Sequence, residues 1–145
     1  MLYLDTSVLL TYTLTQAVEP RRFKATAALM VRITAGEILA ATSFHALHEV
    51  FLFGLGNAPD SPTGAAYGKA ALERILALPV RLLPLVSRME RGLHSRRFQA
   101  MRDPADVPHA IAALVSHCET IVTYDKHFDA IAHLIPCATP EALLD

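Results

Sequence analysis

The stretch LYLDTSVLL at residues 2–10 predicts a strand, an acidic turn and the start of a helix. Its first three residues, LYL, form a short apolar run of the kind that buried strands have. The next three, DTS, are residue types that cap helices, and VLL then resumes the apolar pattern. The chain therefore opens with a strand and a helix joined by a turn that carries the carboxylate of Asp5.

Strands and helices alternate along the rest of the chain. Apolar residues at helical spacing, bounded by caps, prolines or glycines, predict helices at 20–35, 44–55, 65–78, 87–101 and 105–117. Short apolar runs predict strands at 37–42, 80–86, 120–124 and 134–137. We expect residues 54–64, GLGNAPDSPTG, to form a loop in which turn chemistry explains the glycines. This order predicts a three-layer α/β fold, with a central, mainly parallel sheet of four to five strands and helices on both faces.

Composition limits the classes of protein that this chain can represent. A length of 145 residues and a mass of 15.8 kDa predict a single domain spanning 1–145. Apolar types make up 52% and charged types 19%, which is enough apolar material for a packed core. A formal net charge of −1 excludes a protein that binds nucleic acid through bulk positive charge. Any basic surface must therefore be local.

Cysteine use and hydropathy predict where the protein works. Cys118 and Cys137 form no CxxC pair and are too few for a disulfide framework. Residues 76–86 are the most apolar stretch, but Pro79, Arg81 and Pro84 interrupt it, so we expect no membrane span. The N-terminus lacks the basic segment of a secretory signal. We therefore expect a cytoplasmic protein without a membrane partner.

Four acidic residues fall where a parallel sheet would bring them together. Asp5 follows the first strand, Asp106 opens a helix, Asp125 follows a later strand, and Glu49 lies in an apolar helix. Strand ends and helix starts share one edge of a parallel sheet, so the four carboxylates can converge there. Crowded carboxylates cannot all stay ionised without a cation. Oxygen ligands suit Mg²⁺ or Mn²⁺ better than Zn²⁺, so we expect one of these hard cations.

Each acid also has a simpler structural explanation. Asp5 and Asp106 could be helix caps, because aspartate is a favoured capping residue. Asp125 could lie in an exposed turn, and Asp129 or Asp103 could contribute the functional carboxylate instead. Glu49 is the strongest single candidate, since glutamate is seldom buried without a partner.

Three segments together resemble the PIN-domain nucleases, and within them the VapC-type toxin ribonucleases. They are LDTSVLL at 4–10, a helix containing HEV at 48–50, and DVPHAIAALVSHCETIVTYDKHFD at 106–129. The segments span nearly the whole chain, although each motif is short. In that family an acid follows the first strand, another lies on a mid-chain helix, a third opens a later helix and a fourth follows the next strand. Those positions match Asp5, Glu49, Asp106 and Asp125, with Asp103 as an alternative third acid.

The resemblance implies a function for the chain. It implies a Mg²⁺- or Mn²⁺-dependent endoribonuclease that leaves a 5′-phosphate and a 3′-hydroxyl. It also implies the toxin half of a type II toxin–antitoxin pair, with RNA as substrate, an antitoxin protein as partner and a homodimer as the common assembly. Ser7 and Thr123 match hydroxyls beside the first and last acids, where they would orient the metal ligands.

Arginines cluster just before Asp106. Five arginines lie between Arg88 and Arg102, against one acid, Glu90. Arginine suits phosphate oxygens, so Arg96 and Arg97 are candidate RNA contacts. The alternative is an ordinary solvated helix face.

Other functions are also compatible with parts of the sequence. His45 and His48 lie three residues apart on one helix, but no third ligand is evident, and we do not expect a zinc site from this pair. A non-catalytic module that binds RNA or protein would have the same core. An aspartate-dependent phosphohydrolase would need a second acid beside Asp5, where this chain has Thr6 and Ser7.

Overall fold

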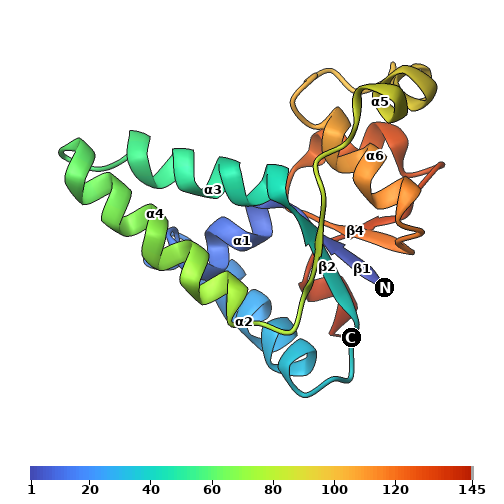
Figure 1. Cartoon of the computed structure of the whole chain (residues 1–145). Coiled ribbons are helices and arrows are strands. Elements are labelled where there is room, and N and C mark those ends of the chain that lie inside the picture. The colour runs from blue at the N-terminus through green and yellow to red at the C-terminus, as the bar shows by residue number, and fades with distance from the viewer. Residues whose placement is uncertain (145) are drawn as a thin grey trace.

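A five-stranded, entirely parallel sheet lies at the centre of the fold in the computed structural model, which describes residues 1–144 (Figure 1). Its order is β3-β2-β1-β4-β5. The strands are β1 (Leu2–Leu4), β2 (Ala40–Ser43), β3 (Arg81–Leu83), β4 (Thr120–Val122) and β5 (Cys137–Ala138). The predicted α/β class with a mainly parallel sheet of four to five strands is confirmed.

Helices cover both faces of the sheet (Figure 1). One face carries α1 (Thr6–Thr13), α2 (Pro20–Thr34), α3 (Phe44–Gly56) and α4 (Ser61–Leu76). The other face carries α5 (Arg88–His94), η1 (Ser95–Phe98), α6 (Val107–Val115) and η2 (Lys126–Ile131). A short helical turn, η3 (Glu141–Leu143), lies near the end of the chain and contacts α2.

Two apolar cores follow from the alternation of side chains along the strands. Tyr3 and Ile121 face the core under α6, whereas their neighbours Leu4 and Val122 face the core under α1 to α4. All four side chains are fully buried. Strands covered on both faces are apolar at every position, which is why they appear in the sequence as short continuous apolar runs.

The strand order creates a switch point beside β1. The chain passes from β1 outward to β2 and β3, and then returns to the opposite side of β1 with β4. Asp5 directly follows β1 and Thr123 directly follows β4, so both lie at the carboxyl edge of this switch point. Such crevices are where open parallel sheets bind ligands.

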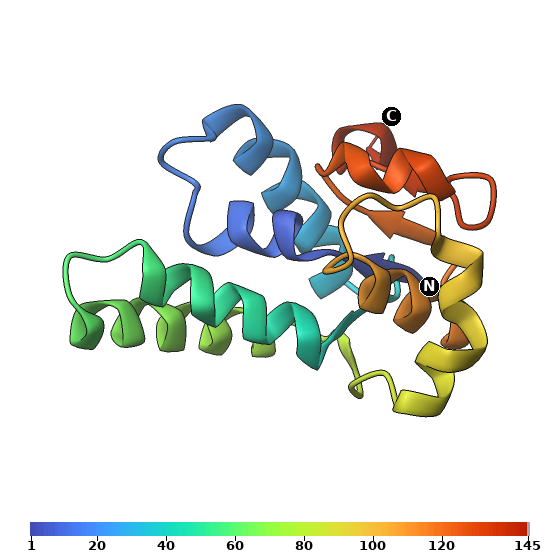
Figure 2. The same cartoon turned by 90° about the horizontal axis from the view of Figure 1, so that it is seen from above.

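The prediction of a loop at residues 54–64 is wrong, because most of these residues are helical. Helix α3 continues to Gly56 and α4 begins at Ser61, so only residues 57–60 connect them. The two helices run side by side as a long hairpin (Figure 2). A Cβ on Gly64 would lie 2.8 Å from Leu55 Cα, and one on Gly54 would lie 2.9 Å from Gly68 N. These glycines therefore permit close helix packing rather than turns.

Several predicted boundaries also shift. Strand β2 begins at Ala40 rather than at residue 37, because Gly36 adopts a left-handed φ of 75° that ends the preceding helix in a turn. The helix predicted at 87–101 is divided into α5 and η1. The last strand, β5, begins at Cys137, the final residue of the predicted strand at 134–137, and η2 was not predicted. Within residues 1–144, no helix is both long and apolar enough to cross a membrane.

The Gly64 contact can be tested by adding one methyl group. Gly64→Ala should lower the free energy of unfolding by about 1–3 kcal/mol, because the methyl meets the Leu55 backbone, which cannot rotate away. Gly92→Ala is the matched control, since a Cβ there meets nothing within 4 Å, and it should raise stability by up to about 1 kcal/mol. Denaturant unfolding measures both. Equal effects of the two substitutions would contradict the close approach.

Candidate active site

Asp5 lies almost fully buried at the end of β1, with 4% of its surface exposed. Its Oδ2 accepts hydrogen bonds from the Ser7 backbone N–H at 3.2 Å, the Ser7 hydroxyl at 2.7 Å and the Thr123 hydroxyl at 2.8 Å. Its Oδ1 lies 3.9 Å from His109 Nδ1. Asp5 is therefore a helix cap, as the simpler explanation holds, and its second oxygen lies beside His109.

Ser7 and Thr123 connect the ends of β1 and β4 around Asp5. The Tyr124 backbone N–H donates to Ser7 Oγ at 2.9 Å, and the Asp125 backbone N–H donates to Thr123 Oγ1 at 2.9 Å. The two hydroxyl oxygens lie 3.2 Å apart. These bonds hold the Asp5 carboxylate in one orientation.

Asp106 does not cap the helix that it precedes. It makes no side-chain capping bond to α6, and its Oδ2 is buried without a hydrogen-bond partner among the described residues. Pro108 removes one of the amides that a cap would bind. Burial and the charges of Asp125, Asp103 and Asp5 raise the pKa of Asp106 to about 6. The cap explanation therefore does not account for this carboxylate.

Asp103 has the structural role instead. Its Oδ1 accepts a hydrogen bond from the Ala105 backbone N–H at 2.8 Å, which forms the turn leading into α6. Asp103, Asp106 and His127 nevertheless offer ligand atoms within 4.8 Å of one another. Asp103 therefore adds negative charge beside Asp106.

Asp125 joins the same group through His127. His127 Nδ1 lies 3.3 Å from Asp106 Oδ2 and 3.5 Å from Asp125 Oδ1. Asp125 also caps η2 by accepting the His127 backbone N–H at 2.8 Å. An adjoining pocket of about 380 Å³ is lined by Thr123, Asp125 and Asp129, together with the cations Arg22 and Lys126.

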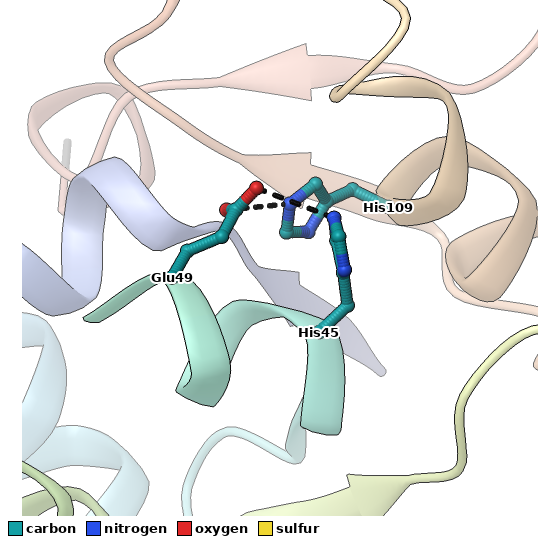
Figure 3. Close-up of side chains that lie close together, drawn as sticks. All are labelled: His45, Glu49 and His109. Atoms are coloured by element: carbon teal, nitrogen blue, oxygen red, sulfur yellow. Dashed lines mark hydrogen bonds and ion pairs between the residues drawn. The ribbon is translucent and has the colours of Figure 1, made fainter. Parts of the chain in front are cut away.

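Glu49 contacts histidines rather than the other acids (Figure 3). His109 Nε2 lies 2.9 Å from its Oε2, His45 Nε2 lies 3.2 Å from its Oε1, and the Thr6 hydroxyl donates to Oε2. Partial burial opposes the ionisation of Glu49, but the bonds and charges of His109, His45 and Thr6 outweigh burial and hold its pKa well below the usual range. Glu49 is thus ionised and already balanced by neighbouring groups.

His109 is the residue of the site that the sequence did not reveal. It is 1% exposed and lies between Asp5 and Glu49. Its Nδ1 lies 2.7 Å from the Tyr3 hydroxyl, which in turn lies 2.8 Å from Ser43 Oγ. The available signal was its position three residues after Asp106, because residues three apart share one helix face.

His45 and His48 do not form a pair. His48 is exposed, whereas His45 faces Glu49 and its ring centre lies 4.7 Å from that of His109. Glu49 raises the pKa of His45 through their contact. The pattern of the sequence showed no third ligand for His45 and His48, whereas the packing of α6 against α3 brings His109, in place of His48, to His45.

Arg96 and Arg97 lie on η1 and are exposed. Neither forms an ion pair within residues 1–144. Element η1 contacts α6, the helix that follows Asp106. Their role as RNA contacts stays a prediction.

The raised pKa of Asp106 predicts a pH-dependent gain from its amide variant. The pKa of Asp106 is higher in the folded state than in the unfolded state, so ionising this carboxyl destabilises the fold. The loss of folding free energy is absent below about pH 4, where Asp106 is protonated in both states, and is complete above about pH 6. In chelator, the free energy of unfolding of Asp106→Asn should equal that of the parent at pH 4 and exceed it by about 2 kcal/mol at pH 8.

Denaturant unfolding at the two pH values measures this difference. Asp60→Asn is the control of opposite sign, because hydrogen bonds from Thr63 lower the pKa of this exposed α4 cap, so its amide variant should lose rather than gain stability between pH 4 and pH 8. A loss of stability in Asp106→Asn at pH 8 would contradict the uncompensated charge.

Comparisons with known proteins support the fold. No family model matches the chain, and no curated protein matches it in sequence. The crystal structure of VapBC2 from Rickettsia felis, bound to a DNA fragment from its promoter, contains a chain that superimposes with a TM-score of 0.66. The two chains are 17% identical over 96% of this chain and 98% of that one. The protein therefore has the same fold as a chain of this VapBC2 structure.

Proposed function

We propose that the protein is a metal-dependent endoribonuclease and the toxin component of a type II toxin–antitoxin pair. The observation that carries this proposal is the buried Oδ2 of Asp106, which lies among other acids and has only His127 Nδ1, at 3.3 Å, to offset its charge within the described residues. A buried carboxylate whose charge is poorly compensated is costly, and a bound cation removes that cost.

The residues fit a hard divalent cation. Asp106 and Asp125 converge on His127, and Asp5 presents its Oδ1 at the same sheet edge. Carboxylate oxygens are the ligands that Mg²⁺ and Mn²⁺ prefer. We assign Asp5, Glu49, Asp106 and Asp125 as the residues that would hold one or two of these ions.

The residues of the chain would divide the work of phosphodiester hydrolysis. Bound Mg²⁺ or Mn²⁺ would supply an activated water and positive charge beside the phosphoryl oxygens. Ser7 and Thr123 hold Asp5 in position, so that carboxylate needs no rearrangement. Asp106 and Asp125 supply the negative charge that attracts the cation.

The partners follow from the same proposal. One solved structure that shares this fold is a VapBC2 complex with DNA, which supports an antitoxin protein as partner for this chain. RNA is the proposed substrate, the cytoplasm the proposed compartment and a homodimer the proposed assembly. The exposed apolar side chains of Leu85, Met89 and Leu93 supply apolar surface of the kind that such interfaces use.

Metal-dependent cleavage is the direct test. Purified protein should cleave structured RNA in Mg²⁺ or Mn²⁺ and should not cleave it in chelator. Asp106→Asn should lower the cleavage rate by orders of magnitude and reduce the rise in melting temperature that Mg²⁺ causes, because a hard cation needs the lost charge.

The matched control is Asp103→Asn, which preserves the turn-forming oxygen beside Ala105 and should retain most activity. A dead Asp103→Asn variant beside an active Asp106→Asn variant would reverse the assignment of the third acid. RNA binding without any cleavage in either cation would instead support the non-catalytic module.

The arginines of η1 supply a second test. Arg96→Ala with Arg97→Ala should weaken binding to all RNA sequences alike and reduce the salt slope by about one for each lost phosphate contact. Both side chains are exposed, so the free energy of unfolding should change by less than about 0.5 kcal/mol. Binding to an RNA that is not cleaved is measured over a series of salt concentrations. If the arginines contact only solvent, the double variant and the parent should show the same slope of affinity against salt.

A further inference from the structure

His45, Glu49 and His109 form a second group of metal-binding side chains beside the acids (Figure 3). Each offers one ligand atom, and these atoms all lie within 4.8 Å of one another. The group differs from the acids because two of its three ligands are imidazole nitrogens. His48, the histidine that the sequence paired with His45, is exposed and does not belong to this group.

The structure prepares His109 as a ligand. Its ring is buried, and its Nδ1 contacts the Tyr3 hydroxyl at 2.7 Å, which directs Nε2 toward Glu49. A metal-binding histidine generally donates its other N–H to a fixed partner, and this bond sets the tautomer and the ring orientation. When zinc replaces the proton on Nε2, Tyr3 can accept the Nδ1 N–H while its own hydroxyl donates to Ser43 Oγ.

His45 supplies a nitrogen whose one near partner among the described residues is the Glu49 carboxylate. Its Nε2 is buried and has no partner in hydrogen-bond geometry within residues 1–144, although Glu49 Oε1 lies 3.2 Å away. A buried polar atom without a partner is unfavourable unless another group occupies the site. The side chains of His45 and Glu49 are 24% and 28% exposed, so an ion can reach them from solvent.

The spacing of the ligand atoms suits a small ion with short bonds. The Glu49 oxygens lie 2.9 Å from His109 Nε2 and 3.2 Å from His45 Nε2. Ligands at about 2.0–2.1 Å from a tetrahedral zinc ion lie about 3.3–3.4 Å apart, so small side-chain movements would complete the geometry. Two imidazoles and one carboxylate select zinc and related transition metals over Mg²⁺, which prefers oxygen.

We propose that His45, Glu49 and His109 bind one zinc ion, at a site separate from the hard-cation site but sharing Glu49 with it. Three protein ligands leave a fourth position open to water or to another ligand. Only the sharing of Glu49 with the hard-cation site rests on the proposed function. Zinc binding itself does not depend on that function and is measured without RNA.

Titration of the metal-free, full-length protein with Zn²⁺ against a chromophoric chelator tests the site. The parent should bind one equivalent, and Co²⁺ in place of Zn²⁺ should develop visible absorption typical of a four-coordinate site. His45→Ala should weaken Zn²⁺ binding by at least about 10-fold, because loss of even an outer partner of a metal ligand has that effect. His48→Ala, on the same helix and exposed, should bind as the parent does.

Asp125→Asn separates this site from the acids. It should retain Zn²⁺ binding while losing the Mg²⁺-dependent rise in melting temperature, because Asp125 belongs only to the acidic group. Zinc-dependent shifts of the His45 and His109 ring signals in NMR spectra of the parent give the same assignment without any substitution.

Absence of stoichiometric zinc binding in the parent would overturn the proposal. Equal Zn²⁺ affinity of His45→Ala and the parent would also overturn it. Loss of zinc binding in Asp125→Asn, with binding retained in His45→Ala, would do the same. Failure of RNA cleavage would leave these measurements unaffected, so the two proposals fail independently.

Discussion

The Asp5 carboxylate at the switch point of the sheet is the constraint on which the site depends. Three donors from Ser7 and Thr123 converge on its Oδ2, and they join the end of β1 to the end of β4. A buried carboxylate needs such donors, because desolvation disfavours its charge. The same bonds that satisfy Asp5 therefore place its second oxygen, and with it the carboxyl edge of the sheet, in a defined position.

Charge is distributed unevenly along this edge. Glu49 lies among His45, His109 and Thr6, so its negative charge is already compensated. Asp106 has little compensation, since burial and neighbouring acids oppose its ionisation, and within residues 1–144 only His127 lies at ion-pair distance from it. The edge thus combines one carboxylate that has nitrogen partners with a group of carboxylates whose negative charge is poorly compensated.

The acids could be predicted because each one follows a local pattern. Asp5 comes directly after a short apolar run, Asp125 comes three residues after the end of another, and Asp106 precedes a run at helical spacing. Parallel strands then bring such positions to one edge whatever the details of packing. The helical hairpin was not predictable in this way, since Gly54 and Gly64 look like turn residues until the two helices are seen to approach through them.

The sequence by itself determined the alternation of strands and helices, the parallel sheet and the acids at its edge, because apolar runs, caps and proline act over a few residues. Only the tertiary structure decided that His109 lies between Asp5 and Glu49 and that His45 faces it. Those neighbours come from β1, α3 and α6, which are far apart in the chain. Their meeting depends on the order β3-β2-β1-β4-β5 and on the packing of helices against both faces, which no local pattern encodes.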